Sequence, residues 1–117
     1  MLKELETRKI GFVEIAESND EKSQLPDVAK VLKPFYSGVI INNAGFNPEK
    51  GINRIRSGIA DAISFGTLYI SNPDLAERIL NGWELNTNVN WAFAYGDAIP
   101  LENKHNGYTD YPNYEKK

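Results

Sequence analysis

Two turns rich in small residues carry the clearest chemical signal in this sequence. Ala44 and Gly45 follow one apolar run, and Gly66 and Thr67 follow the next. Small residues at such turns allow several backbone N–H groups to approach one point, where they bind phosphate oxygens without a charged side chain. We therefore expect a phosphate cradle in which Gly45 and Gly66 are the positions of closest approach. The simpler alternative is that both glycines only let a strand turn into a helix.

Most other catalytic arrangements are excluded by counting. The chain has no cysteine and a single histidine, His105. Disulfides, thiolate catalysis and metal sites built from several imidazoles are therefore excluded within one chain. No nucleophile-elbow motif accompanies His105. We expect this residue to be exposed in the C-terminal tail.

The elements that position the two turns repeat the order strand, turn, helix. Their length and branched residues predict parallel strands over residues 12–16, 38–42 and 61–65. The connections between them are short, as in right-handed βαβ units. The fold class is therefore α/β, with helices on the outer face of the strands.

Helix signals follow each strand. We expect a helix from Asn47 to a stop at Gly58, and a second from an Asn72 cap to Asn81-Gly82. Residues 1–9 are expected to be helical and closed by Gly11. A further helix is expected over 25–36, where Val28, Val31, Leu32 and Phe35 recur at helical spacing and Pro34 ends or bends it.

Longer segments resemble a known family. AGF, GIADAISFG, SNPDLAERI and GYTDYP, within about residues 11–114, are similar to the C-terminal end of the Old Yellow Enzyme family, the FMN-dependent ene reductases. The resemblance implies a partial TIM (β/α)8 barrel, units six to eight plus a C-terminal tail. It also implies that backbone amides at Ala44-Gly45 and Gly66-Thr67 hold the FMN phosphate. Tyr108 in GYTDYP then lies near flavin and substrate.

The sequence departs from this family in two ways. The family usually has Arg where this chain has Thr67, so the phosphate loses a charged, bidentate partner and FMN affinity should be weakened. The strands that carry the family's substrate-binding pair and proton donor have no counterpart in the sequence, so no catalytic residue is assigned. We expect an FMN-binding portion of an NAD(P)H:flavin oxidoreductase (alkene reductase) that does not catalyse alone.

Several polar and aromatic residues have more than one interpretation. Glu14 interrupts an apolar run and could face a ligand, but such a residue more often lines a barrel interior with a basic partner or lies on an exposed edge. Glu17 occupies a position that is also acidic in the family. The aromatic residues of the tail suggest a cage, but they more often pin an irregular tail to a core; they are Trp83, Trp91, Phe93 and Tyr95.

Length and composition limit the assembly and the partners. A full barrel needs about 250 residues, and this chain has 117, with 25% charged residues and a net charge of −3. We expect one domain over 1–117 with a tail from about 83. No basic stripe supports nucleic-acid binding, and no apolar segment supports a signal peptide or a membrane span. A cytoplasmic location is the default.

Two hypotheses of different classes remain open. The chain is either a fragment, split gene product or truncated remnant of an FMN-dependent oxidoreductase that retains the phosphate-binding half of the site, or a non-catalytic module that self-associates through exposed strand edges. In both cases we expect a homo-oligomer, or a complementary chain that supplies the missing strands.

Overall fold

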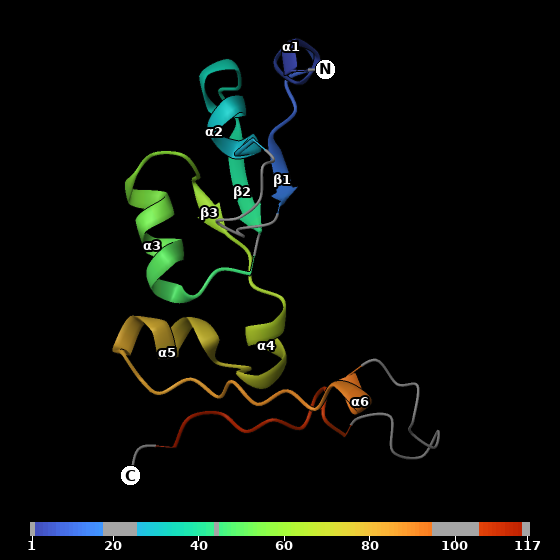
Figure 1. Cartoon of the computed structure of the whole chain (residues 1–117), viewed down its shortest axis with the longest axis vertical. Helices are drawn as coiled ribbons and strands as arrows, with labels where there is room; N and C mark the ends of the chain where they lie inside the picture. Colours follow the sequence, from blue (N-terminus) through green and yellow to red (C-terminus); the bar gives the residue numbers. More distant parts are fainter. Residues whose placement is uncertain (1, 18–25, 44, 95–105, 116–117) are drawn as a thin grey trace. The chain divides into compact units, whose positions relative to one another are not determined.

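The computed structural model describes residues 2–17, 26–43, 45–94 and 106–115 (Figure 1). The chain divides into two compact units, Met1–Phe65 and Gly66–Lys117. Ala44, Tyr95 and His105 lie outside the described residues, so the predictions for them stay predictions. Within the described part of the chain, no helix is long and apolar enough to cross a membrane.

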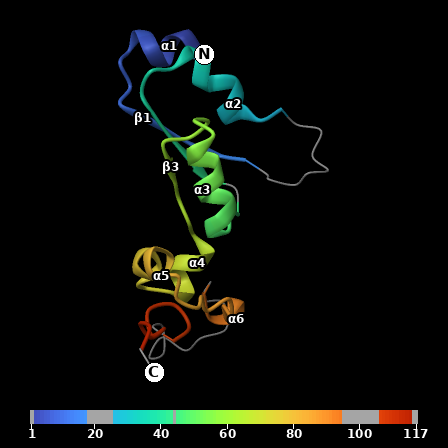
Figure 2. The ribbon, with the colours of Figure 1, turned by 90° about the vertical axis from the view of Figure 1, so that its left-hand side faces the viewer.

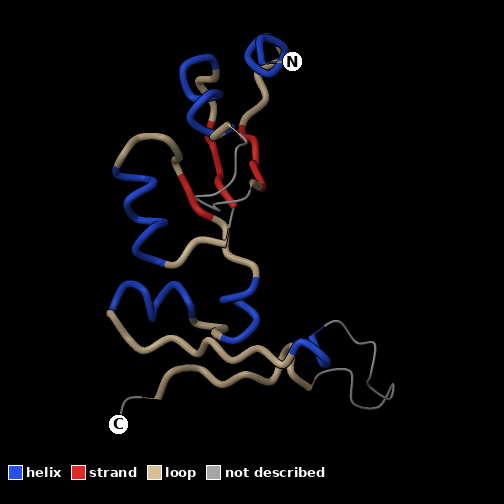
Figure 3. Tube along the Cα trace, viewed as in Figure 1, coloured by secondary structure: helices blue, strands red, loops and turns tan. Residues whose placement is uncertain are grey.

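The first unit is built on three parallel strands in the order β1-β2-β3, which Figure 3 shows side by side. Phe12 lies opposite Val39, and Ile41 lies opposite Ala62. The predicted order and direction are confirmed. The strand bounds are β1 Phe12–Ala16, β2 Val39–Asn43 and β3 Ala62–Ile63.

The third strand is shorter than the predicted 61–65. Beyond Ile63, the described residues continue the ladder through the Ser64 N–H, which donates to the Asn42 carbonyl at 3.1 Å. Before the strand, the Asp61 carboxylate accepts a hydrogen bond from the backbone N–H of Ile40 at 2.9 Å. A side chain therefore takes the place of a backbone acceptor at this edge.

Helices cover one face of the sheet (Figures 1 and 2). They are α1 (Leu2–Thr7), α2 (Val28–Leu32) with the 3₁₀ turn η1 (Lys33–Phe35), and α3 (Pro48–Arg56). The core lies between these elements and the strands. Its buried members are Ala29, Leu32, Tyr36, Ile40 and Ala60, and Val13, Ile15 and Ile63 pack against them.

In the described part of this unit, no helix lies on the opposite face of the sheet. Side chains alternate along a strand, so Phe12, paired with Val39, points away from the face that Ile40 buries. Phe12 is 61% exposed and Val39 is 44% exposed. The prediction of helices on the outer face and a bare inner face is therefore confirmed for the first unit.

Helix α3 follows its sequence signals. The side chain of Asn47 caps it by accepting a hydrogen bond from the Lys50 N–H at 2.8 Å, and Pro48 occupies the first turn. The chain leaves the helix through Gly58, whose φ is +74°. At α1 the expectation was wrong, because Lys9 rather than Gly11 reverses the chain after Thr7, with a φ of +51°.

In its described residues, the second unit contains three short helices and an extended C-terminal segment. Figure 1 shows residues 110–115 running beside residues 83–90. The predicted Asn72 cap is wrong: Asn72 is fully buried, and its side chain bonds both backbone groups of Asn86. The helices are α4 (Thr67–Ser71), α5 (Leu75–Asn81) and α6 (Trp91–Ala94).

Candidate functional site

Gly45 occupies a backbone conformation that suits glycine. Its φ is +63°, in the left-handed region, and a Cβ built at this position meets no atom within 4 Å. The next residue, Phe46, is buried at 7% exposure, which fixes the turn from one side. The backbone conformation at position 45 therefore favours glycine, and the space beside its Cα could admit a ligand.

Gly66 and Thr67 form the start of α4. Gly66 is the N-cap residue and has no side chain that can bond the first amides of the helix. A Cβ at Gly66 also meets nothing within 4 Å. Thr67 is exposed. Uncapped N–H groups beside open space are the arrangement that binds an anion's oxygens.

Tyr108 lies in the turn over residues 106–109 and is 53% exposed. It belongs to the second unit together with Gly66 and Thr67, whereas Gly45 belongs to the first. The structure thus describes each half of the predicted cradle separately. A joint phosphate site stays a prediction.

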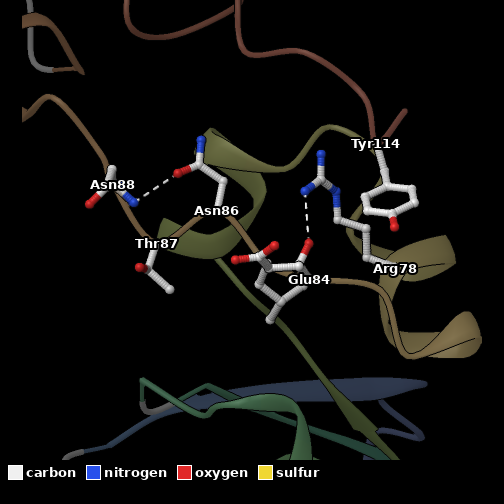
Figure 4. Close-up of a pocket in the computed structure, with 7 residues that line it drawn as sticks. Arg78, Glu84, Asn86, Thr87, Asn88 and Tyr114 are labelled. Atoms are coloured by element: carbon white, nitrogen blue, oxygen red, sulfur yellow. Dashed lines mark hydrogen bonds between the residues drawn. The ribbon is translucent and has the colours of Figure 1, made fainter. Parts of the chain in front are cut away.

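Arg78 and Asp74 hold the segment that follows Tyr108. The Arg78 Nε donates to Asp74 Oδ1 at 2.6 Å, and their side chains are 7% and 9% exposed. Arg78 also donates to the carbonyls of Glu84 (3.0 Å) and Pro112 (3.1 Å). The guanidinium lies 5.7 Å from the centre of the Tyr114 ring. Figure 4 shows Arg78 beside that ring.

The charge on Asp74 is stabilised by its partners. Burial alone would raise its pKa, but hydrogen bonds from the backbone N–H of Tyr114 and from Arg78 outweigh burial and hold the pKa below its ordinary value. A pocket of about 340 Å³ lies next to this pair, lined by Arg78, Tyr114 and residues 84–88 (Figure 4). Its lining is more polar than apolar.

Aromatic packing explains part of the tail. The Trp83 ring stacks on the Tyr114 ring, with centres 4.6 Å apart and planes 15° apart. Both residues lie in the tail, so this stack joins two parts of the tail, and the prediction that aromatic residues pin it to a core stays a prediction. Trp91 and Phe93 are 47% and 36% exposed.

Glu14 lies on the open face of the sheet. Its Oε1 accepts a hydrogen bond from the Ser64 hydroxyl at 2.6 Å, and Ser64 accepts one from the Asn43 amide at 2.9 Å. Glu14 thus bonds a hydroxyl, and it is exposed on the edge strand β1, as one of the two structural alternatives predicted. The three side chains come from β1, β2 and the residue after β3, on the face that a complete barrel would enclose.

Sequence reasoning missed a partly buried polar cluster centred on Arg54. Its guanidinium bonds Asp27 through both terminal nitrogens at 2.5 Å, Glu17 at 3.1 Å and Asn42 at 2.8 Å. The hydrogen bonds and charge of Asp27 raise the pKa of Arg54, and Arg54 lowers that of Asp27. The available signal was Asn42, a polar residue inside a buried apolar strand.

The cluster joins elements of the first unit to one another. Glu17 also accepts hydrogen bonds from the Val28 N–H and from Asn42, so it joins the end of β1 to the start of α2. Among the described residues, no group of His, Asp and Glu side chains could hold a metal ion.

The chain is similar to several flavin-dependent reductases. It is 38% identical over 95 residues to 12-oxophytodienoate reductase 7 of Oryza sativa subsp. japonica, covering 81% of this chain and 22% of the relative. It is 33% identical over 110 residues to a protein of Leishmania infantum named probable flavin mononucleotide-dependent alkene reductase, covering 93% of this chain and 28% of the relative.

A solved structure gives the same result. The old yellow enzyme from Trypanosoma cruzi superposes with a TM-score of 0.79 at 32% identity, covering 97% of this chain and 28% of that one. No family model matches the chain.

These likenesses fix both fold and family. The chain spans 22% to 28% of the length of the proteins it matches. Its three parallel strands with helices form part of a (β/α)8 barrel. The chain belongs to the Old Yellow Enzyme family of flavin oxidoreductases.

Proposed function

We propose that this chain is the C-terminal, FMN-phosphate-binding portion of an Old Yellow Enzyme-like NAD(P)H:flavin oxidoreductase, an alkene reductase. Backbone amides at Gly45 and Thr67 hold the phosphate. Ala44 and Gly66 complete the two turns, and Tyr108 lies near the flavin. We also propose that the protein is cytoplasmic.

One observation carries the proposal. Gly45 has a φ of +63° with open space around its Cα, and Gly66 precedes the helix α4 with open space and no side-chain cap. Both turns follow strands of the sheet, and the relatives of the chain include a protein named as a flavin mononucleotide-dependent alkene reductase. Backbone amides exposed in this way fit a phosphate group. Bound FMN would supply the hydride chemistry of the reaction.

The residues present supply phosphate binding but no complete catalytic set. Thr67 offers one hydroxyl hydrogen bond to a phosphate oxygen and no positive charge. We therefore propose that affinity for free FMN is low and that the chain does not reduce alkenes alone. A second copy of the chain, or a chain that supplies further strands, completes the site.

The test is an FMN titration followed by flavin fluorescence. Gly45→Val should abolish binding, because a branched side chain at positive φ is strained and fills the open space. Thr67→Arg should tighten binding by roughly 1.5–3 kcal/mol, the worth of a hydrogen bond to a charged group. Thr7→Arg, an exposed change elsewhere in the chain, is the matched control for added charge. Equal affinity in wild type and both site variants, or no binding even by Thr67→Arg, would exclude the cradle.

A second candidate is a self-associating module without FMN. The exposed Phe12 and Val39 on the open sheet face favour it, since apolar surface of this kind is normally covered by a partner. A yellow purified protein with a flavin absorption band supports the first function. A colourless oligomer supports the second.

A further inference from the structure

We propose that Asp74 and Arg78 are a positioning pair that fixes the turn carrying Tyr108. The inference rests on the proposed function in one respect, the placement of Tyr108 near FMN. The anchoring itself is a separate claim about the second unit. It makes the α5 helix part of the cofactor site, although neither residue of the pair is assigned a contact with the cofactor.

The pair contacts the C-terminal segment at two backbone groups, those of Pro112 and Tyr114. Asp74 Oδ2 accepts the backbone N–H of Tyr114 at 2.7 Å, while its Oδ1 accepts from Arg78. Arg78 in turn donates to the carbonyl of Pro112. One carboxylate and one guanidinium thereby satisfy a donor and an acceptor of the same short segment.

The segment depends on such side-chain contacts because it lacks regular structure of its own. Residues 110–115 belong to no helix or strand. Arg78 reaches a second segment through the Glu84 carbonyl, and the Trp83 ring covers Tyr114. The guanidinium therefore ties both extended stretches to α5.

The anchor is close enough to Tyr108 to control its position. Pro112 is four residues away, and proline restricts the backbone between them. Within that interval the Tyr111 hydroxyl accepts the Asn90 N–H at 2.9 Å, and Asp110 accepts the Gly107 N–H at 2.6 Å. These two hydrogen bonds restrain the chain between the anchor and Tyr108.

Two conservative variants separate anchoring from bulk packing. Arg78→Lys keeps the positive charge but cannot donate to Asp74, Glu84 and Pro112 in the same planar geometry. Asp74→Asn keeps an oxygen for the Tyr114 N–H and removes the charge. Arg8→Lys is the matched control, because Arg8 forms the same i,i+4 pair with Glu4 at the surface, where the side chains are 73% and 62% exposed.

The first measurement is amide hydrogen exchange on the chain without ligand. In Arg78→Lys, exchange in residues 106–115 should be about tenfold faster, because local opening of this segment then no longer has to break the hydrogen bonds of the anchor. Exchange of the first unit should stay unchanged, and Arg8→Lys should match wild type. Unchanged exchange in both Asp74→Asn and Arg78→Lys would overturn the proposal, whether or not FMN binds.

The second measurement is FMN affinity in a double-mutant cycle. Arg78→Lys should weaken FMN binding about fivefold in the wild-type background and have little effect in a Tyr108→Ala background, since the pair acts through Tyr108. Equal losses in both backgrounds would show a merely structural role. If wild type binds no FMN, the proposed function fails, and the exchange experiment alone decides whether the pair fixes the turn.

Discussion

Arg54 is the residue on which the polar organisation of the first unit depends. Its side chain is only 14% exposed, and its partners Glu17 and Asp27 come from outside its own helix. A buried ion pair is not in itself strong support for stability, but removing one partner leaves the other charges buried without compensation. Removing Arg54 should therefore lower the free energy of unfolding by more than the intact ion pairs contribute to it.

We predict that Arg54→Ala lowers the free energy of unfolding by roughly 3 kcal/mol, the lower end of the cost of breaking a buried pair. Urea denaturation followed by circular dichroism measures the change. Arg56→Ala, an exposed substitution in the same helix, should change the free energy by less than about 0.5 kcal/mol. Similar effects of the two substitutions would contradict the role given to the cluster.

Asp27 gives a prediction for pH dependence. The side-chain hydrogen bonds of Arg54 hold the pKa of Asp27 below its ordinary 3.8 in the folded chain. A carboxyl whose pKa is lower in the folded state stabilises the fold above its unfolded pKa, and this contribution is lost as pH falls through the folded pKa. The free energy of unfolding should therefore decrease as the pH is lowered below about 4.

Asp27→Asn is the informative variant for this effect. Asparagine still caps α2, as Asp27 does through the Lys30 N–H at 2.9 Å, but it cannot titrate. The variant should be less stable than wild type at neutral pH, and its stability should fall less between pH 5 and pH 3. A slope equal to that of wild type would assign the acid sensitivity to other carboxyls.

At the scale of elements, the capped helix α3 is the part most accurately predicted from sequence. Asn47, Pro48 and Gly58 are local signals, and each acts through its own backbone geometry. Asn72 offered the same pattern and failed, because its side chain is used across fourteen residues to hold Asn86. Tertiary contacts of that kind leave no local trace in a sequence.

Helix α2 also shows what a local pattern cannot predict, in this case which face of the helix is buried. Four apolar residues at helical spacing predicted the helix, and Pro34 predicted that it ends or bends there; in the structure the α-helix ends and a 3₁₀ turn follows. The periodicity did not identify the buried face: Leu32 is buried, whereas Val28, Val31 and Phe35 are 44%, 50% and 58% exposed. The face that turns inward depends on the sheet, where Ile40 packs against Ala29 and Leu32.

The α3 cap gives the prediction at this scale. Asn47→Ala should lower the free energy of unfolding by about 1 kcal/mol, because the Lys50 N–H loses its acceptor. Asn53→Ala, at an exposed position within the same helix, should be neutral or slightly stabilising, since alanine is the better helix former. Thermal denaturation of both variants distinguishes the cap from a general effect of removing asparagine.

At the scale of the whole molecule, the parallel order, the helix-covered face and the family were all predictable. The strand segments are apolar and short, and the family motifs span turns, strand β3 and helix α5. The details of the candidate site were less accessible, because the Arg54 cluster and the Arg78 anchor join residues far apart in sequence. The sequence signals for them are Asn42 in a buried apolar strand and the i,i+4 spacing of Asp74 and Arg78.

The open sheet face leads to the prediction for assembly. Phe12 and Val39 lie opposite each other on β1 and β2, and both are largely exposed on the face without helices. Burying such a pair in a second copy gains about 25 cal/mol for each Å² of apolar surface removed from water. We therefore expect the chain alone to form at least a homodimer through this face.

Light scattering coupled to size-exclusion chromatography tests this assembly, with Phe12→Ser and Phe35→Ser as a matched pair. Phe12 is 61% exposed on the open face, and Phe35 is 58% exposed on η1, which belongs to the helical layer. The two substitutions remove similar exposed surface, so a general gain in solubility would affect both alike. Phe12→Ser should shift the chain towards monomer, because it removes apolar surface from the interface, and Phe35→Ser should leave the oligomer intact. A stable wild-type monomer, or an equal shift in both variants, would show that the open face is not the surface through which the chain associates.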